Sequence, residues 1–176
     1  MKKFILAMFL LSVSGASAQE GITLTGECSN YLTVVTDPAT GTGMVSPKKR
    51  FVISNDKGKT GLAVLLMMDK AKTTVICNFI ALGEGNCVNE KSLLNIQFTD
   101  GTQLTLANET EPNCRGSVTA YLDKKSGLKE LDELVAKKIK SVKLNTNNGH
   151  VEENFTAAQA EQFSSIINCL VSLKKG

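Results

Sequence analysis

The chain has 176 residues, of which 42% are hydrophobic and 21% charged, and its 20 basic and 17 acidic side chains give a formal net charge of +3. Apolar content near the average, with only three prolines, excludes a disordered, collagen-like or coiled-coil chain. The length suits one globular domain, which we place at residues 19–176.

Residues 1–18 have the pattern of a secretory signal peptide. Lys2 and Lys3 form the positive start, residues 4–13 the apolar stretch and residues 16–18 a small-residue cleavage site. A transmembrane helix needs about 20 apolar residues, so this shorter stretch predicts no membrane span in the mature chain. No cysteine follows the cleavage site, which argues against a lipid anchor. We therefore expect an exported protein, either periplasmic or extracellular.

Loss of the signal peptide would remove two lysines and leave the mature chain nearly neutral. Against that balance, we interpret the basic clusters at residues 48–50 and 137–140 as solvated faces. The sequence therefore predicts no nucleic-acid partner.

The five cysteines all follow the signal peptide. Export favours disulfides, and an odd number allows at most two bridges within one chain. At least one thiol is then free, buried or paired with another molecule. A disulfide-linked dimer is one of these alternatives.

The first half of the mature chain predicts strands separated by polar turns. We interpret residues 36–47, which contain Asp37-Pro38 and two glycines, as a long loop. Apolar runs rich in Val and Ile then predict strands at 51–53, 62–68 and 73–82, with a turn at 69–72. Residues 62–68 are apolar at both parities, so we expect that strand and its partner at the centre of the sheet, covered on both faces.

A hairpin is predicted over residues 93–106, and two loop lengths compete for it. A two-residue loop would split the apolar side chains between the two faces. A three-residue loop, residues 99–101, sets Leu94 opposite Leu106 and Ile96 opposite Leu104, so we prefer it. It also places Gly101 at the left-handed position that such loops require.

Extending this ladder outward brings residue 87 opposite residue 113, so Cys87–Cys114 is the preferred disulfide. A small bulge near Pro112 would close the remaining gap. Cys77 lies within a buried strand and is the candidate unpaired thiol. Cys28 and Cys169 remain as the second pair, which would tie the N-terminal strand to the last helix.

The C-terminal third changes to a helical period. Apolar residues from 128 to 135 predict one helix, and Asn148-Gly149 predicts a hairpin turn that sets Val142 opposite Phe155. Thr156 and Gln159 then form a capping box that opens a second helix, whose apolar face runs from residue 163 to 171.

No residue pattern identifies an enzyme. His150 is the only histidine and lies in a predicted turn, where it has no nucleophile beside it. Acidic pairs at 109/111, 132/133 and 152/153 fall in polar loops or exposed faces. Cysteine and histidine spacing fits no zinc site, and the asparagines at 145, 147 and 148 are explained by the turn. We therefore expect no metal and no cofactor.

Three short motifs resemble small exported proteins of Bacteroidetes-type bacteria, mostly of unknown function. They are residues 98–102, residues 137–144 and Cys169-Leu170. The resemblance covers the C-terminal half and implies an exported α+β protein without implying an activity. The chain lacks the lipobox that many of these relatives carry.

Together these patterns predict an α+β fold: a mostly antiparallel sheet of about six to eight strands with two helices, one of them C-terminal. We expect an exported, non-enzymatic binding or structural protein, whose partner is an unidentified protein or small ligand. The alternative is a periplasmic enzyme whose site residues converge only in the fold.

Overall fold

The computed structural model describes residues 24–36, 43–54, 59–69, 74–122 and 128–175. The expected signal peptide at 1–18 lies outside these residues, as does most of the predicted turn at 69–72. The buried apolar side chains of the described segments form one core cluster.

The α+β prediction is confirmed, with two antiparallel sheets and a C-terminal helix. The first sheet has the order β1-β2-β4-β5-β8, and β3 also pairs with β4. Its strands are β1 (Leu32–Thr36), β2 (Gly43–Pro47), β3 (Phe51–Ile53), β4 (Gly61–Asp69), β5 (Val75–Leu82) and β8 (Ser117–Tyr121).

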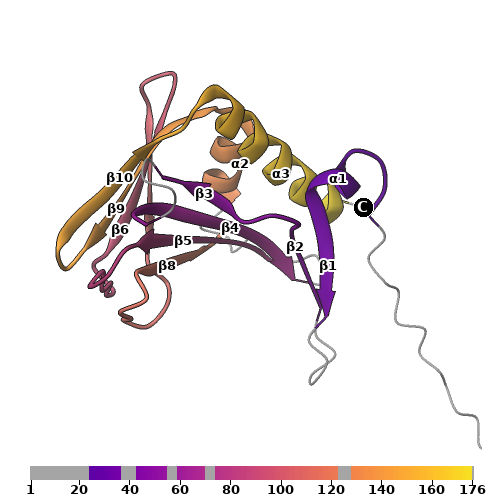
Figure 1. Ribbon diagram of the computed structural model, residues 1–176. Coiled ribbons are helices and arrows are strands. Elements are labelled where there is room, and N and C mark those ends of the chain that lie inside the picture. The colour runs from indigo at the N-terminus through magenta and orange to yellow at the C-terminus, as the bar shows by residue number, and fades with distance from the viewer. Residues whose placement is uncertain (1–23, 37–42, 55–58, 70–73, 123–127, 176) are drawn as a thin grey trace, which may run out of the picture.

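The second sheet has the order β10-β9-β6-β7. Its strands are β6 (Leu93–Phe98), β7 (Gln103–Ala107), β9 (Ile139–Thr146) and β10 (Gly149–Asn154). The described helices are α1 (Cys28–Tyr31), α2 (Leu128–Ala136) and α3 (Ala157–Lys175). Figure 1 shows α2 and α3 on the same side of the strands, with α3 running from the end of β10 toward α1. None of the described helices is long and apolar enough to cross a membrane.

Alternation along the strands directs one set of side chains into the core. On β4, Leu62, Val64, Leu66 and Met68 are at most 2% exposed. The long C-terminal helix α3 packs against β4, α1 and α2 from this inner side. The first sheet therefore has an inner face under the helices and an outer face that no helix covers (Figure 1).

The predicted central position of β4 and β5 is confirmed, because strands pair with both edges of each. The prediction that both faces are covered is wrong. On the outer face, Ala63, Leu65 and Met67 remain partly exposed. The helices are all used on the inner side, so the second apolar parity of β4 faces outward and leaves an uncovered apolar surface.

The loop predicted at residues 36–47 is wrong in its last part. Residues 43–47 form β2, which pairs with β1 in the register Val34↔Val45 and with β4 through Val45↔Met68. Only Met44 and Val45 in this segment are large and apolar. Two such residues among glycines and small polar residues are too few to show strand alternation.

The β6–β7 hairpin has the predicted three-residue register, with Leu94↔Leu106 and Ile96↔Leu104. Gly101 has φ 85°, in the left-handed region that this loop requires. The hydrophobic pattern determined this register, because a slip of one residue would turn the apolar side chains toward solvent.

The β9–β10 register differs from the prediction by two residues. Thr146 pairs with Gly149, so Asn147 and Asn148 form the loop and Val142 pairs with Glu153 instead of Phe155. A shift of two keeps every side chain on its predicted face, so the hydrophobic pattern could not reveal it. The turn is held by distant groups: Asn147 Oδ1 accepts from the Cys87 amide, and Asn148 Nδ2 donates to the Gly85 carbonyl.

Helix α3 begins as the capping box predicts. The Thr156 hydroxyl accepts from the Gln159 amide at 3.2 Å, and Gln159 Oε1 accepts from the Thr156 amide at 2.9 Å. Phe155, which precedes the cap, packs its ring 6.1 Å from that of Phe163 and 5.5 Å from that of Phe51. These contacts join the start of α3 to β3.

The structure contains two disulfides, Cys87–Cys114 and Cys28–Cys169, which are the pairs that the sequence favours. The third position, Cys77, carries a buried free thiol on β5. An unpaired cysteine in this position cannot reach another chain, so the structure gives no support to a disulfide-linked dimer.

Candidate functional site

A groove of about 750 Å³ lies on the outer face of the first sheet. Its floor is made of residues from β4, β5 and β8, and its wall is the segment from Glu109 to Arg115, which joins β7 to β8. Antiparallel sheets that face solvent on one side usually carry polar residues there. An apolar floor in such a position is therefore unusual.

The floor combines apolar side chains from two neighbouring strands. Leu65 and Met67 come from β4 and Ile80 from β5, and Pro112 adds an apolar contact from the wall. The apolar surface extends past the groove toward the sheet edge, where Val52 is 41% exposed and Val35 is 53% exposed. An apolar sheet face of this kind is typical of a binding surface.

Three polar side chains interrupt the apolar floor. Asn78 on β5 lies between Ser117 and Thr119 on β8, and its Nδ2 donates to both hydroxyl oxygens at 2.7 Å. Thr119 is only 8% exposed, so this group is set deep in the floor. We call these three residues the floor triad.

The wall is fixed by covalent and backbone bonds. The Cys87–Cys114 disulfide joins it to the segment that follows β5. Next to this bridge, Val88 and Asn113 exchange backbone hydrogen bonds of 2.8 and 2.9 Å. Asn113 Oδ1 also accepts from the Arg115 and Ser117 amides. The wall is therefore held in place without a ligand.

Gly116 closes the wall against the sheet. Its φ is 67°, and its carbonyl accepts from the Ala81 amide at 2.9 Å. A Cβ at this position would lie 2.8 Å from the Ala81 carbonyl oxygen. Glycine is thus required for both its backbone conformation and its close approach to β5.

A second asparagine organises the start of the wall. Asn108 is 7% exposed, and its Oδ1 accepts from the amides of Thr110 and Thr119. Its Nδ2 donates to the Asn89 and Thr110 carbonyls. This residue therefore links the end of β7 to β8 beside the floor triad.

The groove carries charge of both signs on its wall. Glu109, Glu111 and Arg115 all line it. Glu109 Oε1 accepts from the Tyr121 amide at 2.9 Å, so one carboxylate caps the free edge of β8. Two acidic side chains against one basic side chain make the wall slightly acidic.

The candidate catalytic residues do not meet in this groove. His150 is exposed on β10, opposite Asn145. Of the acidic pairs, only 109/111 lines the groove, while Glu152 and Glu153 point to opposite sides of β10 and Asp132 is exposed. Within the described segments, no group of three or more His, Cys, Asp or Glu side chains could hold a metal ion.

Cys77 is 1% exposed, and burial raises the pKa of its thiol far above the ordinary value. A thiol in this state is a poor nucleophile. We expect a thiol reagent to leave the native protein unlabelled and to label one cysteine per chain after unfolding without a reductant. Mass spectrometry of the labelled chains checks this, and labelling of native protein would show that Cys77 is accessible.

A second groove, of about 410 Å³, lies on the outer face of the second sheet. Its lining is almost entirely polar: Asn95, Gln97, Gln103, Ser141, Lys143, Asn145 and Glu152. Several of these groups bond one another, as Asn95 Oδ1 accepts from Gln103 Nε2 and from the Thr105 hydroxyl. A polar face is what a solvated antiparallel sheet ordinarily shows.

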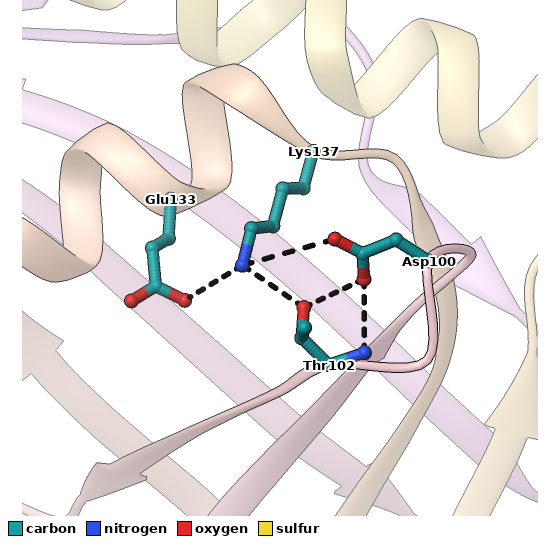
Figure 2. A network of polar contacts seen from close by, with 4 residues as sticks. All are labelled: Asp100, Thr102, Glu133 and Lys137. Atoms are coloured by element: carbon teal, nitrogen blue, oxygen red, sulfur yellow. Dashed lines mark hydrogen bonds and ion pairs between the residues drawn. The ribbon is translucent and has the colours of Figure 1, made fainter.

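Figure 2 shows a polar network in which Lys137, at the end of α2, points toward the β6–β7 turn. Its Nζ lies 2.9 Å from the Thr102 hydroxyl, 3.4 Å from Glu133 Oε2 and 3.9 Å from Asp100 Oδ2. It also lies 5.2 Å from the centre of the buried Phe98 ring. The network joins α2 to the hairpin and contacts neither groove, so we assign it a structural role.

Hydrogen bonds from the Thr102 hydroxyl and amide, with the Lys137 charge, lower the pKa of Asp100 below its ordinary value of 3.8. A lowered pKa in the folded state stabilises the protein above pH 3.8, and this contribution is lost as pH falls through the folded-state pKa. We therefore expect wild type to exceed Asp100→Asn in stability at neutral pH and the difference to shrink in acid. Urea unfolding of both proteins at pH 7 and about pH 2.5 checks this; a constant difference would contradict it.

No protein-family model, curated protein or solved structure matches this chain. The resemblance to exported Bacteroidetes-type proteins therefore remains a prediction. Assignment of a function rests on the groove itself.

Proposed function

We propose that this chain is an exported, non-enzymatic binding protein whose ligand occupies the groove on the outer face of the first sheet. The observation that carries the proposal is the apolar floor at Leu65, Met67 and Ile80, on a sheet face that ordinarily carries polar residues. Concave apolar surfaces with a few placed polar groups are the usual form of ligand sites.

Three further features support binding over catalysis. The wall is anchored by a disulfide and by the Asn113 side chain, so the groove is preformed and little ordering free energy is lost on binding. The one free thiol faces the core, and the one histidine lies on the other sheet. No nucleophile and base therefore meet in the groove.

Two disulfides support the proposed export, because such bridges persist mainly in oxidising compartments. The expected leader at 1–18 agrees with this proposal. Whether the protein acts in the periplasm or outside the cell depends on its ligand.

The proposal can be tested with Nile red, a neutral dye that fluoresces in apolar surroundings. We expect wild type to bind it and Met67→Gln to bind about tenfold more weakly, since a polar amide then lies in the floor. Val52→Gln is the matched control, because it makes the same face more polar outside the groove lining. An equal loss in both variants, or no binding by wild type, would overturn the proposal.

A further inference from the structure

The floor triad, Asn78 with Ser117 and Thr119, offers hydrogen bonds that no described residue uses. Both hydrogens of the Asn78 amide are directed at the two hydroxyl oxygens. A hydroxyl that accepts in this way keeps its own hydrogen available as a donor. Asn78 Oδ1 accepts from none of the described residues, so the triad presents two donors and one acceptor.

We propose that the ligand is an extended, apolar peptide segment, one of whose peptide groups binds the floor triad. This inference rests on the proposed binding function and specifies its ligand. A peptide group carries one carbonyl acceptor and one N–H donor. The carbonyl would accept from the hydroxyls of Ser117 and Thr119, and the N–H would donate to Asn78 Oδ1.

The surroundings of the triad favour a peptide over an acyl chain. Leu65, Met67 and Ile80 would contact apolar side chains beside the bound peptide group. A plain hydrocarbon would cover the triad and leave its polar groups unpaired, which costs free energy. A carboxylate would satisfy the donors, but it would leave Asn78 Oδ1 unpaired and would lie in a groove whose wall carries Glu109 and Glu111.

Asn78 acts as a positioning residue as well as an acceptor. Its amide engages both hydroxyl oxygens and so directs their hydrogens away from itself. An aspartate at this position has only acceptors, so both hydroxyls would donate to it and neither would donate to the ligand. Asn78→Asp therefore reverses the hydrogen-bonding character of the site with almost no change in shape.

The test is isothermal titration calorimetry with two probes, acetyl-trivaline methylamide and dodecanoate. We expect wild type to bind the peptide more tightly than dodecanoate. Asn78→Asp should bind the peptide about tenfold more weakly, as expected for the loss of about two hydrogen bonds. Thr119→Val, which removes one hydroxyl at constant shape, should weaken peptide binding about threefold to fivefold.

Arg115→Gln is the control for charge, because it changes the net charge of the groove by the same amount as Asn78→Asp. It should bind the uncharged peptide as wild type does. Equal loss in Arg115→Gln and Asn78→Asp would overturn the role of the triad. Tighter binding of dodecanoate than of the peptide would overturn the peptide assignment and leave the groove as a ligand site. If neither probe nor Nile red binds, the proposed function itself is wrong.

Discussion

Removal of the Cys28–Cys169 disulfide is expected to lower the free energy of unfolding by about 4 to 5 kcal/mol. The bridge spans 141 residues, and the chain-entropy contribution of a disulfide grows with the loop it closes. It also attaches α1, a four-residue helix that buries no side chain of its own.

The measurement is guanidinium unfolding of the double variant Cys28→Ser/Cys169→Ser. Cys77→Ala is the control, because it removes a cysteine and leaves both bridges intact. We also expect faster hydrogen exchange in α1 of the double variant, since no other covalent link holds that helix. A loss of stability no larger than that of Cys77→Ala would show that packing alone holds α1 to α3.

Removal of the Cys87–Cys114 disulfide is expected to cost about 3 to 4 kcal/mol, because the loop it closes is shorter, with a sequence separation of 27. This bridge anchors the groove wall, so Cys87→Ser/Cys114→Ser should also weaken Nile red binding. The two effects can be separated by comparing variants under conditions where both remain folded.

Cys28→Ser/Cys169→Ser serves as the matched control for binding, since it makes the same chemical change at residues that do not line the groove. It should bind Nile red as wild type does, despite its larger loss of stability. Equal weakening in both double variants would mean that binding follows overall stability and not the position of the wall.

Local register explains why both disulfides could be predicted from the sequence. The apolar residues of the β6–β7 hairpin allow one alignment, and that alignment brings Cys87 close to Cys114. The structure continues the pairing through Val88↔Asn113, one step out of the predicted register. With Cys77 in a buried strand, one pair remained. The capping box at Thr156 was equally local.

The features that could not be predicted depend on contacts between distant segments. The β9–β10 turn is shifted by two residues because Asn147 and Asn148 bond to residues near Cys87, which no pattern within the hairpin reveals. Strand β2 has only Met44 and Val45 as apolar signals. Its place is determined by pairing with β1 and β4.

The candidate site was missed for a related reason. An apolar strand face predicts a covering layer, and the sequence does not reveal which face the helices will cover. Leu65 and Met67 therefore indicated burial, whereas the structure leaves them at the floor of a groove. Asn78 was the one signal available, because it is a polar residue within an otherwise apolar strand.

Nuclear magnetic resonance mapping of Nile red on ¹⁵N-labelled wild type tests the central claim, that the outer groove of the first sheet is the ligand site. We predict shifts in the amide signals of Leu65, Met67, Asn78, Ile80 and Thr119, which belong to β4, β5 and β8. Shifts centred instead on Gln97 and Lys143 of the polar groove, or no shifts at all, would contradict the claim.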